Sequence, residues 1–183
     1  MQLFSHAVRR SALWEDDRPW APVQPSGIGG AGAKSRLVRA DAIDFGGGIK
    51  FPRPLLMLQD VDARRGGTAD GIIGLGVLRQ LNLSTDTRRD VLWVQRNALP
   101  PPPRRYALSG IWIEERKGAL LVDQVGRGSP AEAAGVQVGD VVLGEQFRPL
   151  ISKLGGPPGR EVTIRIRRGP DERQATMRLD PYL

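Results

Sequence analysis

Short apolar runs separated by glycine and proline make up the first hundred residues. Residues 37–45 alternate loosely between apolar and polar positions, three glycines follow at 46–48, and residues 49–58 are apolar between prolines. This arrangement predicts a β-hairpin. Leucines at helical spacing predict one short helix within 75–83, and the apolar run at 91–94 predicts a short buried strand after a polar turn.

The second half of the chain has the pattern of a small mixed domain. Two strands are expected at 110–114 and 119–125, joined by a charged turn. Ser129 is a good helix N-cap, Pro130 suits the first helical position and Gly135 can end the helix, so a short helix is expected at 130–134. The remaining predicted strands lie at 141–143, 162–168 and 174–179, the last two forming a hairpin.

A run of four prolines at 100–103 divides the chain. Successive prolines favour an extended polyproline conformation and cannot support a sheet ladder. With 183 residues, 23 glycines and 15 prolines, the chain is expected to form two small domains that are mainly β. The predicted division is a first domain at 1–97, a proline-rich linker at 98–105 and a second domain at 106–183.

Charge and composition indicate which kinds of partner and location to expect for this chain. The formal net charge is +7, but basic residues are scattered among acidic ones and aromatic residues are few, so nucleic-acid binding is not expected. No stretch is long enough to cross a bilayer, and the first residues lack the apolar core of a signal peptide, which predicts a soluble chain of unknown compartment. The absence of cysteine excludes thiol chemistry without fixing the compartment.

Three motifs in the second half resemble the signature of PDZ domains. They are Gly-Ser-Pro-Ala at 128–131, Ala-Gly-Val at 134–136 and Gly-Asp-Val-Val at 139–142, and both their order and their spacing fit. The resemblance covers about residues 106–179. It implies a small β-barrel with one or two short helices.

PDZ domains bind peptides by strand addition, with the terminal carboxylate received by backbone N–H groups of a loop. The resemblance places that loop and its edge strand at residues that would form the peptide-binding site: Leu108, Ser109, Gly110, Ile111 and Ile113. The alternative is that Ile111 and Ile113 are core residues. The segment between Asp140 and Pro158 is shorter than is usual in the family, so the helix expected at 149–154 would be a stunted second wall of the groove.

The first half resembles bacterial retropepsin-like aspartic proteases. The sequence DGIIGLGVLR at 70–79 is similar to their D-G-x-L-G-x-x-F-L-R element, and residues 83–86 with 91–93 resemble their closing strand pair. The resemblance implies an acid-protease β-barrel, incomplete at its N-terminus. It also implies a substrate-site frame (Asp70, Gly71, Ile72, Ile73, Gly74) and a glycine-rich flap (Gly27, Ile28, Gly29, Gly30, Ala31, Gly32).

Aspartic proteases need two carboxylates that share one proton, each supplied by a D-T-G or D-S-G loop. Neither tripeptide occurs in the chain, so no catalytic residue is assigned and the chain as given is expected to be inactive. In the resembling proteases the loop precedes a segment like residues 3–10. A longer gene product carrying it upstream of Met1 is therefore a hypothesis, and a homodimer would pair two such halves.

Other signals are weaker. Residues 27–32 fit G-x-G-x-x-G, but no strand precedes them and no helix follows, so no dinucleotide or other cofactor is expected. Ser5 and His6 are neighbours in sequence without a triad, and the scattered acids form no metal-ligand loop. The four tryptophans are expected in cores or over sheet edges.

Two functions are consistent with these patterns. The first is an aspartic-type endopeptidase with a PDZ domain that binds peptide or protein substrates, inactive as given. The alternative is a non-catalytic scaffold that binds C-terminal peptides through its PDZ groove.

Overall fold

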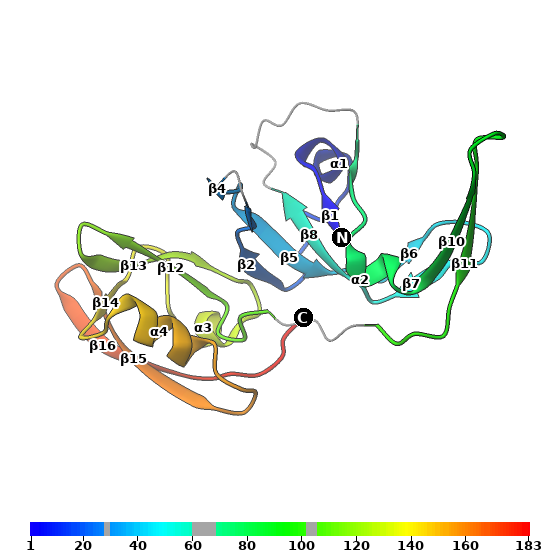
Figure 1. Ribbon diagram of the computed structural model, residues 1–183. Helices are drawn as coiled ribbons and strands as arrows, with labels where there is room; N and C mark the ends of the chain where they lie inside the picture. The colour runs from blue at the N-terminus through cyan, green and yellow to red at the C-terminus, as the bar shows by residue number, and fades with distance from the viewer. Residues whose placement is uncertain (28–29, 60–68, 102–105) are drawn as a thin grey trace.

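The computed structural model of the chain describes residues 1–183 except 28–29, 60–68 and 102–105, and only the backbone of 26–27 and 30–31. The fold is mainly β, with two five-stranded sheets, three two-stranded ribbons and four short helices in the described part (Figure 1). The sheets within that part are open ladders and not closed barrels.

The first five-stranded sheet lies before the proline run. Its order is β2-β5-β8-β1-β9, formed by Trp20–Val23, Ser35–Arg39, Leu55–Gln59, Gln2–Leu3 and Gly71–Ile72. Strand β1 runs parallel to β8 and antiparallel to β9, so it joins β9 to the sheet. Helix α1 (Ser5–Arg10) packs against this sheet, with Val8 fully buried beside Val38 and Leu58.

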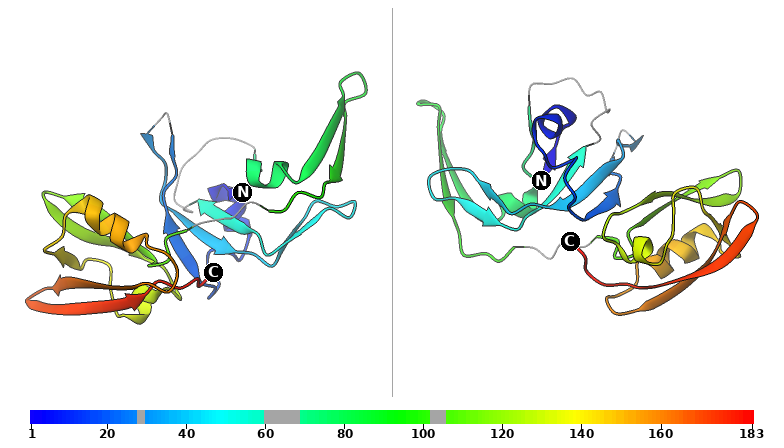
Figure 2. Two further views of the ribbon diagram at one scale, coloured as in Figure 1. Left: turned by 60° about the horizontal axis from the view of Figure 1, so that its bottom comes forward. Right: turned by 180° about the vertical axis from the view of Figure 1, so that it is seen from behind.

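The hairpin expected around the three glycines is confirmed. Strands β6 (Ala42–Asp44) and β7 (Lys50–Pro52) pair with Ile43 opposite Phe51, and β5 pairs with β8 with Leu37 opposite Met57. Gly46–Gly48 turn the chain, all with positive φ. The hairpin therefore begins in the main sheet with β5 and β8 and continues beyond it as the two-stranded ribbon β6–β7 (Figure 2).

Two predictions for residues 75–94 are wrong in part. Helix α2 covers only Leu75–Leu78, and β10 (Leu81–Asp86) begins where the helix was expected to continue, because residues 81–86 pair along their whole length with β11 (Val91–Arg96). Residues 91–94 are a strand but not a buried one: the exposed fraction is 56% for Leu92 and 53% for Trp93. The β10–β11 ribbon extends away from the first five-stranded sheet (Figure 1).

The second sheet follows chain order. Its strands are β12 (Ile111–Arg116), β13 (Ala119–Val125), β14 (Val141–Leu143), β15 (Glu161–Arg168) and β16 (Asp171–Arg178), and β12 and β16 are its edges. Inward side chains of alternate positions form its core, among them Val122, Ile164 and Ile166. The β15–β16 hairpin is confirmed, with Ile164 opposite Ala175.

Two helices accompany this sheet. Helix α3 (Pro130–Ala133) forms as expected: the Ser129 hydroxyl accepts a hydrogen bond from the Glu132 N–H at 3.2 Å, and the Glu132 carboxylate accepts one from the Gly128 N–H at 2.6 Å. Helix α4 (Phe147–Leu154) has two turns and is longer than the expected 149–154. No helix in the described ranges is long and apolar enough to cross a membrane.

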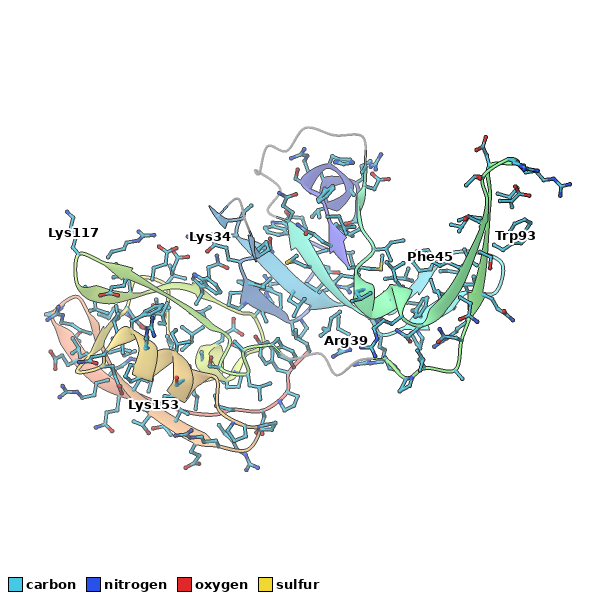
Figure 3. The ribbon with its side chains drawn as sticks, in the orientation of Figure 1. Lys34, Arg39, Phe45, Trp93, Lys117 and Lys153 are labelled. Atoms are coloured by element: carbon cyan, nitrogen blue, oxygen red, sulfur yellow. The ribbon has the colours of Figure 1, made fainter. Side chains whose placement is uncertain are left out.

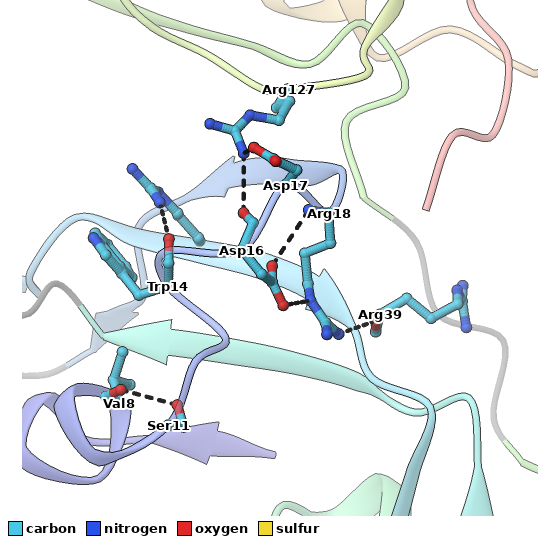
Figure 4. Close-up of polar contacts among 9 residues, drawn as sticks. Val8, Ser11, Trp14, Asp16, Asp17, Arg18, Arg39 and Arg127 are labelled. Atoms are coloured by element: carbon cyan, nitrogen blue, oxygen red, sulfur yellow. Dashed lines mark hydrogen bonds and ion pairs between the residues drawn. The ribbon is translucent and has the colours of Figure 1, made fainter.

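The two halves meet at the glycine turn, which we define as Gly126–Gly128. The Trp20 N–H donates to the Arg127 carbonyl at 3.1 Å, and a Cβ on Gly126 would lie 2.2 Å from the Trp20 carbonyl oxygen. Only glycine therefore permits this approach. The Arg127 guanidinium also reaches the Asp16 carbonyl and the Asp17 carboxylate, both at 2.9 Å (Figure 4).

Charged side chains extend this contact. Lys34 lies 2.6 Å from the Asp123 carboxylate and 3.3 Å from that of Glu114, on the outward face of β12 and β13. The hydrogen bond to Asp123 raises the pKa of Lys34 above its usual 10.5, although burial opposes this. The Arg36 guanidinium stacks between the rings of Trp14 and Trp20, at 4.0 and 4.7 Å from their centroids. These two tryptophans do pack on the first core, as predicted.

A buried ion pair connects two turns of the second sheet. Asp140 is almost fully buried and accepts hydrogen bonds from Arg168 Nε at 2.7 Å, Arg168 Nη2 at 2.8 Å and the Gln137 N–H at 2.9 Å. Burial alone raises the pKa of the Asp140 carboxyl, but the hydrogen bonds from Arg168 and Gln137 outweigh it, so the net pKa lies below 3.8.

We expect Asp140→Asn to lower the free energy of unfolding by about 2–3 kcal/mol at pH 7, because charge-assisted hydrogen bonds are lost. The folded-state pKa is depressed, so this stabilisation is complete above pH 3.8 and is lost as the pH falls through the lower folded value. Urea unfolding from pH 7 to pH 2 measures it. Asp41→Asn, at an exposed position just before β6 and in the other half of the chain, is the matched control. A gap between wild type and Asp140→Asn that stays constant to pH 2 would contradict the assignment.

Candidate functional site

Strand β12 has an unpaired edge. Within the described part of the chain it pairs only with β13, in a register that runs from Ile111 opposite Val125 to Arg116 opposite Ala119. An unpaired edge presents a row of backbone N–H and C=O groups to any extended segment that lies beside it. A bulge between Trp112 and Ile113 shifts the register near the start of the strand.

Backbone hydrogen bonds fix the loop before β12. Gly110 has a φ of +73°, and its N–H donates to the Ala107 carbonyl at 3.1 Å. The Gly110 carbonyl accepts from the Gly126 N–H at 2.8 Å, and the Ser109 carbonyl accepts from the Ala131 N–H at 3.1 Å. The loop is therefore attached to both the glycine turn and α3. Residues with a Cβ rarely adopt this left-handed backbone conformation, so glycine is favoured at position 110.

The two isoleucines of the predicted site are core residues. Ile111 and Ile113 are both buried and belong to the main apolar cluster of the second half. The structure therefore supports the core alternative for their side chains, whereas Leu108 packs only partly against that cluster. The Ser109 hydroxyl is buried and has no hydrogen-bond partner among the described residues.

Helix α4 lies against β12 and forms a second wall. Its Leu150 and Leu154 are buried in the core, while Phe147 and Ile151, one turn apart on another face, are 37% and 42% exposed. Side chains at positions i and i+4 lie one above the other on a helix. This pair therefore gives α4 an apolar stripe beside its core-facing residues.

A cavity of about 580 Å³ lies beside the loop. Its lining includes Leu108, Tyr106, the 155–158 turn that follows α4, and Arg39 from the first sheet. The Tyr106 hydroxyl oxygen accepts hydrogen bonds from the backbone N–H groups of Tyr182 and Leu183 at 2.9 and 3.0 Å. Tyr182 and Leu183 are thus hydrogen-bonded to Tyr106, just before the loop.

The five residues of the predicted frame form β9, which pairs with β1, and the segments on either side of it. Gly71 and Ile72 form β9, opposite Leu3 and Gln2, and the Asp70 carbonyl accepts from the Phe4 N–H at 2.9 Å. A Cβ on Gly71 would lie 2.2 Å from the Gln2 carbonyl oxygen, so the pairing requires glycine there. Gly74 is the N-cap of α2, and the side chains of Ile72 and Ile73 are largely exposed.

The Asp70 carboxylate has basic side chains as neighbours. It lies 2.9 Å from His6 Nε2, accepts a hydrogen bond from Arg10, and is 64% exposed. Its recorded partners are both bases, and no second carboxylate is among them. Within the described residues no cluster of three or more acids or histidines that could hold a metal is present.

The glycine-rich segment forms a short hairpin. Strands β3 (Ser26–Gly27) and β4 (Gly30–Ala31) pair, and the Gly32 N–H donates to the Pro25 carbonyl at 2.7 Å. Ile28 and Gly29, which were assigned to the flap, lie outside the described residues. The next element is β5 and not a helix, so a dinucleotide site is not formed here.

Sequence reasoning missed Phe147, Ile151 and Arg39. The apolar pair could have been found from its i, i+4 spacing after Gly144, had the helix been placed two residues earlier. Nothing in the sequence places Arg39 beside a loop 70 residues away, because that proximity depends on how the halves pack.

Comparisons with known proteins give no relative. No family model matches the chain, and neither curated proteins nor solved structures contain a match. The site therefore has to be interpreted from its own geometry.

We expect Gly71→Ala to lower the free energy of unfolding by about 1–3 kcal/mol, because the new methyl group overlaps the Gln2 carbonyl and separates β9 from β1. Gly74→Ala is the control, since a Cβ there meets only the Met1 backbone nitrogen at 4.0 Å. Urea unfolding followed by hydrogen exchange of the Gln2–Leu3 amides measures both. Equal stability of the two variants would show that β1 and β9 are not packed as described.

Proposed function

We propose that the second half of the chain binds extended peptides by strand addition at β12, as the resemblance to PDZ domains implies. The observation that carries the proposal is one edge strand with a left-handed glycine loop at its start and an apolar helix face alongside. Backbone pairing supplies affinity in this mode, and pockets for alternate side chains supply specificity.

The walls of this site indicate which peptides suit it. Phe147 and Ile151 present apolar surface, and the cavity beside Leu108 contains Arg39. An apolar last side chain and a free terminal carboxylate complement these groups. We therefore propose C-terminal peptides with an apolar last residue as the ligand class.

For the first half we propose a retropepsin-like frame at 1–97 without catalytic activity in this chain, joined by the linker 98–105 to the peptide-binding domain at 106–183. The short glycine hairpin β3–β4 and the frame around Gly71 support this assignment. The described partners of the Asp70 carboxylate are Arg10 and His6, whereas the chemistry needs a second carboxylate.

Peptide binding is tested by fluorescence polarisation with labelled peptides ending in valine. We expect saturable binding by the full chain, and at least about tenfold weaker binding when the terminal carboxylate is amidated. Ile151→Glu should weaken binding about tenfold or more, because it places a carboxylate on the apolar wall opposite the peptide. Amide shifts on β12 would locate the contact by NMR.

Ser152→Glu introduces the same charge at the next position of α4, which is exposed and on a different face, and should leave the affinity unchanged. If wild type binds none of a set of peptides with varied apolar ends, or if the two glutamate variants weaken binding equally, strand addition at β12 is the wrong assignment.

The absence of catalysis is tested separately. We expect the chain to leave unfolded casein intact at pH 3.5–5, because no carboxylate pair activates water. Pepstatin-sensitive cleavage, retained after purification to homogeneity, would show that the first half is an active protease.

A further inference from the structure

A second cavity, of about 290 Å³, lies in the first half of the chain. The side chains around it come from the end of β5, the β6–β7 hairpin and its continuation, α2 and the end of β11. Three of the lining residues are arginines, Arg39, Arg53 and Arg96, and none of the described lining residues is an acid. Its apolar lining includes Phe51, Leu55 and Val77. A cluster of guanidinium groups without an internal carboxylate is a site that attracts anions.

The guanidinium of Arg39 is only partly satisfied by the protein. Its Nη1 donates to the Arg53 carbonyl at 2.7 Å, but its Nε is buried and has no hydrogen-bond partner among the described residues. A buried N–H of a charged group without an acceptor is costly. Arg39 lies at the end of β5 away from the glycine hairpin, below the first sheet in Figure 3. An acceptor bound in the cavity would remove this cost.

The backbone at Arg53 is strained. Its φ is +45°, a conformation that non-glycine residues seldom adopt. The Arg53 N–H donates to the Asp41 carbonyl at 2.8 Å, and the Arg53 carbonyl accepts from Arg39, so the surrounding structure holds this conformation. Strained residues of this kind are frequent at binding sites. The Arg53 guanidinium itself has no recorded partner within the described residues, although it lines the cavity.

Arg96 closes the cavity from the ribbon side. Its Nη1 donates to the Lys50 carbonyl at 2.7 Å, and its guanidinium carbon lies 4.9 Å from the centroid of the buried Phe51 ring. The stacking orients the guanidinium fork, and the remaining donors stay available. The same cavity thus offers cationic donors and an apolar floor.

We propose that this cavity binds a small organic anion, with its carboxylate or phosphate group held by Arg39, Arg53 and Arg96 and its apolar body against Phe51, Leu55 and Val77. Guanidinium forks match the geometry of oxyanions with two or more oxygens. The volume is at the lower end for small-molecule sites, which suits a ligand of about one ring and one charged group. This cavity is distinct from the one beside Leu108, and Arg39 lines both.

Isothermal titration calorimetry of the full chain at low ionic strength tests the proposal. The probes are phenyl phosphate and benzoate, with benzyl alcohol as the uncharged control. We expect saturable one-to-one binding of at least one anion, with the tighter one identifying the head group, and no detectable binding of the alcohol. Arg39→Gln should weaken binding at least about tenfold, and Arg39→Lys should also weaken it, because lysine keeps the charge but loses the fork.

Arg167→Gln on the exposed face of β15 is the matched control and should not change the affinity. If wild type binds neither anion at millimolar concentration, or if Arg39→Gln and Arg167→Gln bind like wild type, the proposal fails. If circular dichroism shows that Arg39→Gln is unfolded, variants of the exposed Arg53 and Arg96 replace it in the test. Wild-type affinity in both Arg53→Gln and Arg96→Gln would then contradict the proposal.

Discussion

The close approach of two backbones at the glycine turn is the contact on which the arrangement of this protein depends. Gly126 donates to the Gly110 carbonyl, the Arg127 carbonyl accepts from Trp20, and Gly128 donates to the Glu132 carboxylate that caps α3. One three-residue segment therefore joins the loop before β12, strand β2 of the other half and the start of α3. A side chain on Gly126 would overlap the Trp20 carbonyl, so the two halves could not meet in this way.

This junction brings side chains of the first half close to loops and strands of the second half. Arg39 of the first sheet lines both the cavity beside Leu108 and the arginine cavity. Lys34 pairs with Glu114 and Asp123 on β12 and β13, as Arg116 also does, while the edge of β12 remains unpaired in the described part. The contact between the halves is largely polar and charged, as expected for domains that pack without sharing a core. The two apolar clusters are indeed separate.

The β10–β11 ribbon is the least covered part of the described structure. Opposite residues of an antiparallel pair share a face, so Leu83 with Val94 and Thr85 with Leu92 form one largely apolar side. A two-stranded ribbon alone is marginally stable in water. The homodimer that the resemblance implied stays a prediction.

Local patterns by themselves determined much of this protein. The glycine-centred hairpin and the capped helix after Ser129 follow from neighbouring residues, because turns and caps depend on short-range backbone geometry. The absence of a D-T-G or D-S-G tripeptide is a property of the sequence itself. Only the tertiary structure decided that Ile111 and Ile113 face the core, that Trp93 is exposed, that residues 81–86 leave the helix to pair with β11, and that Arg39 stands beside Leu108. These outcomes depend on which surfaces meet across long stretches of chain, and the spacing of apolar residues carries no information about the partner that will cover them.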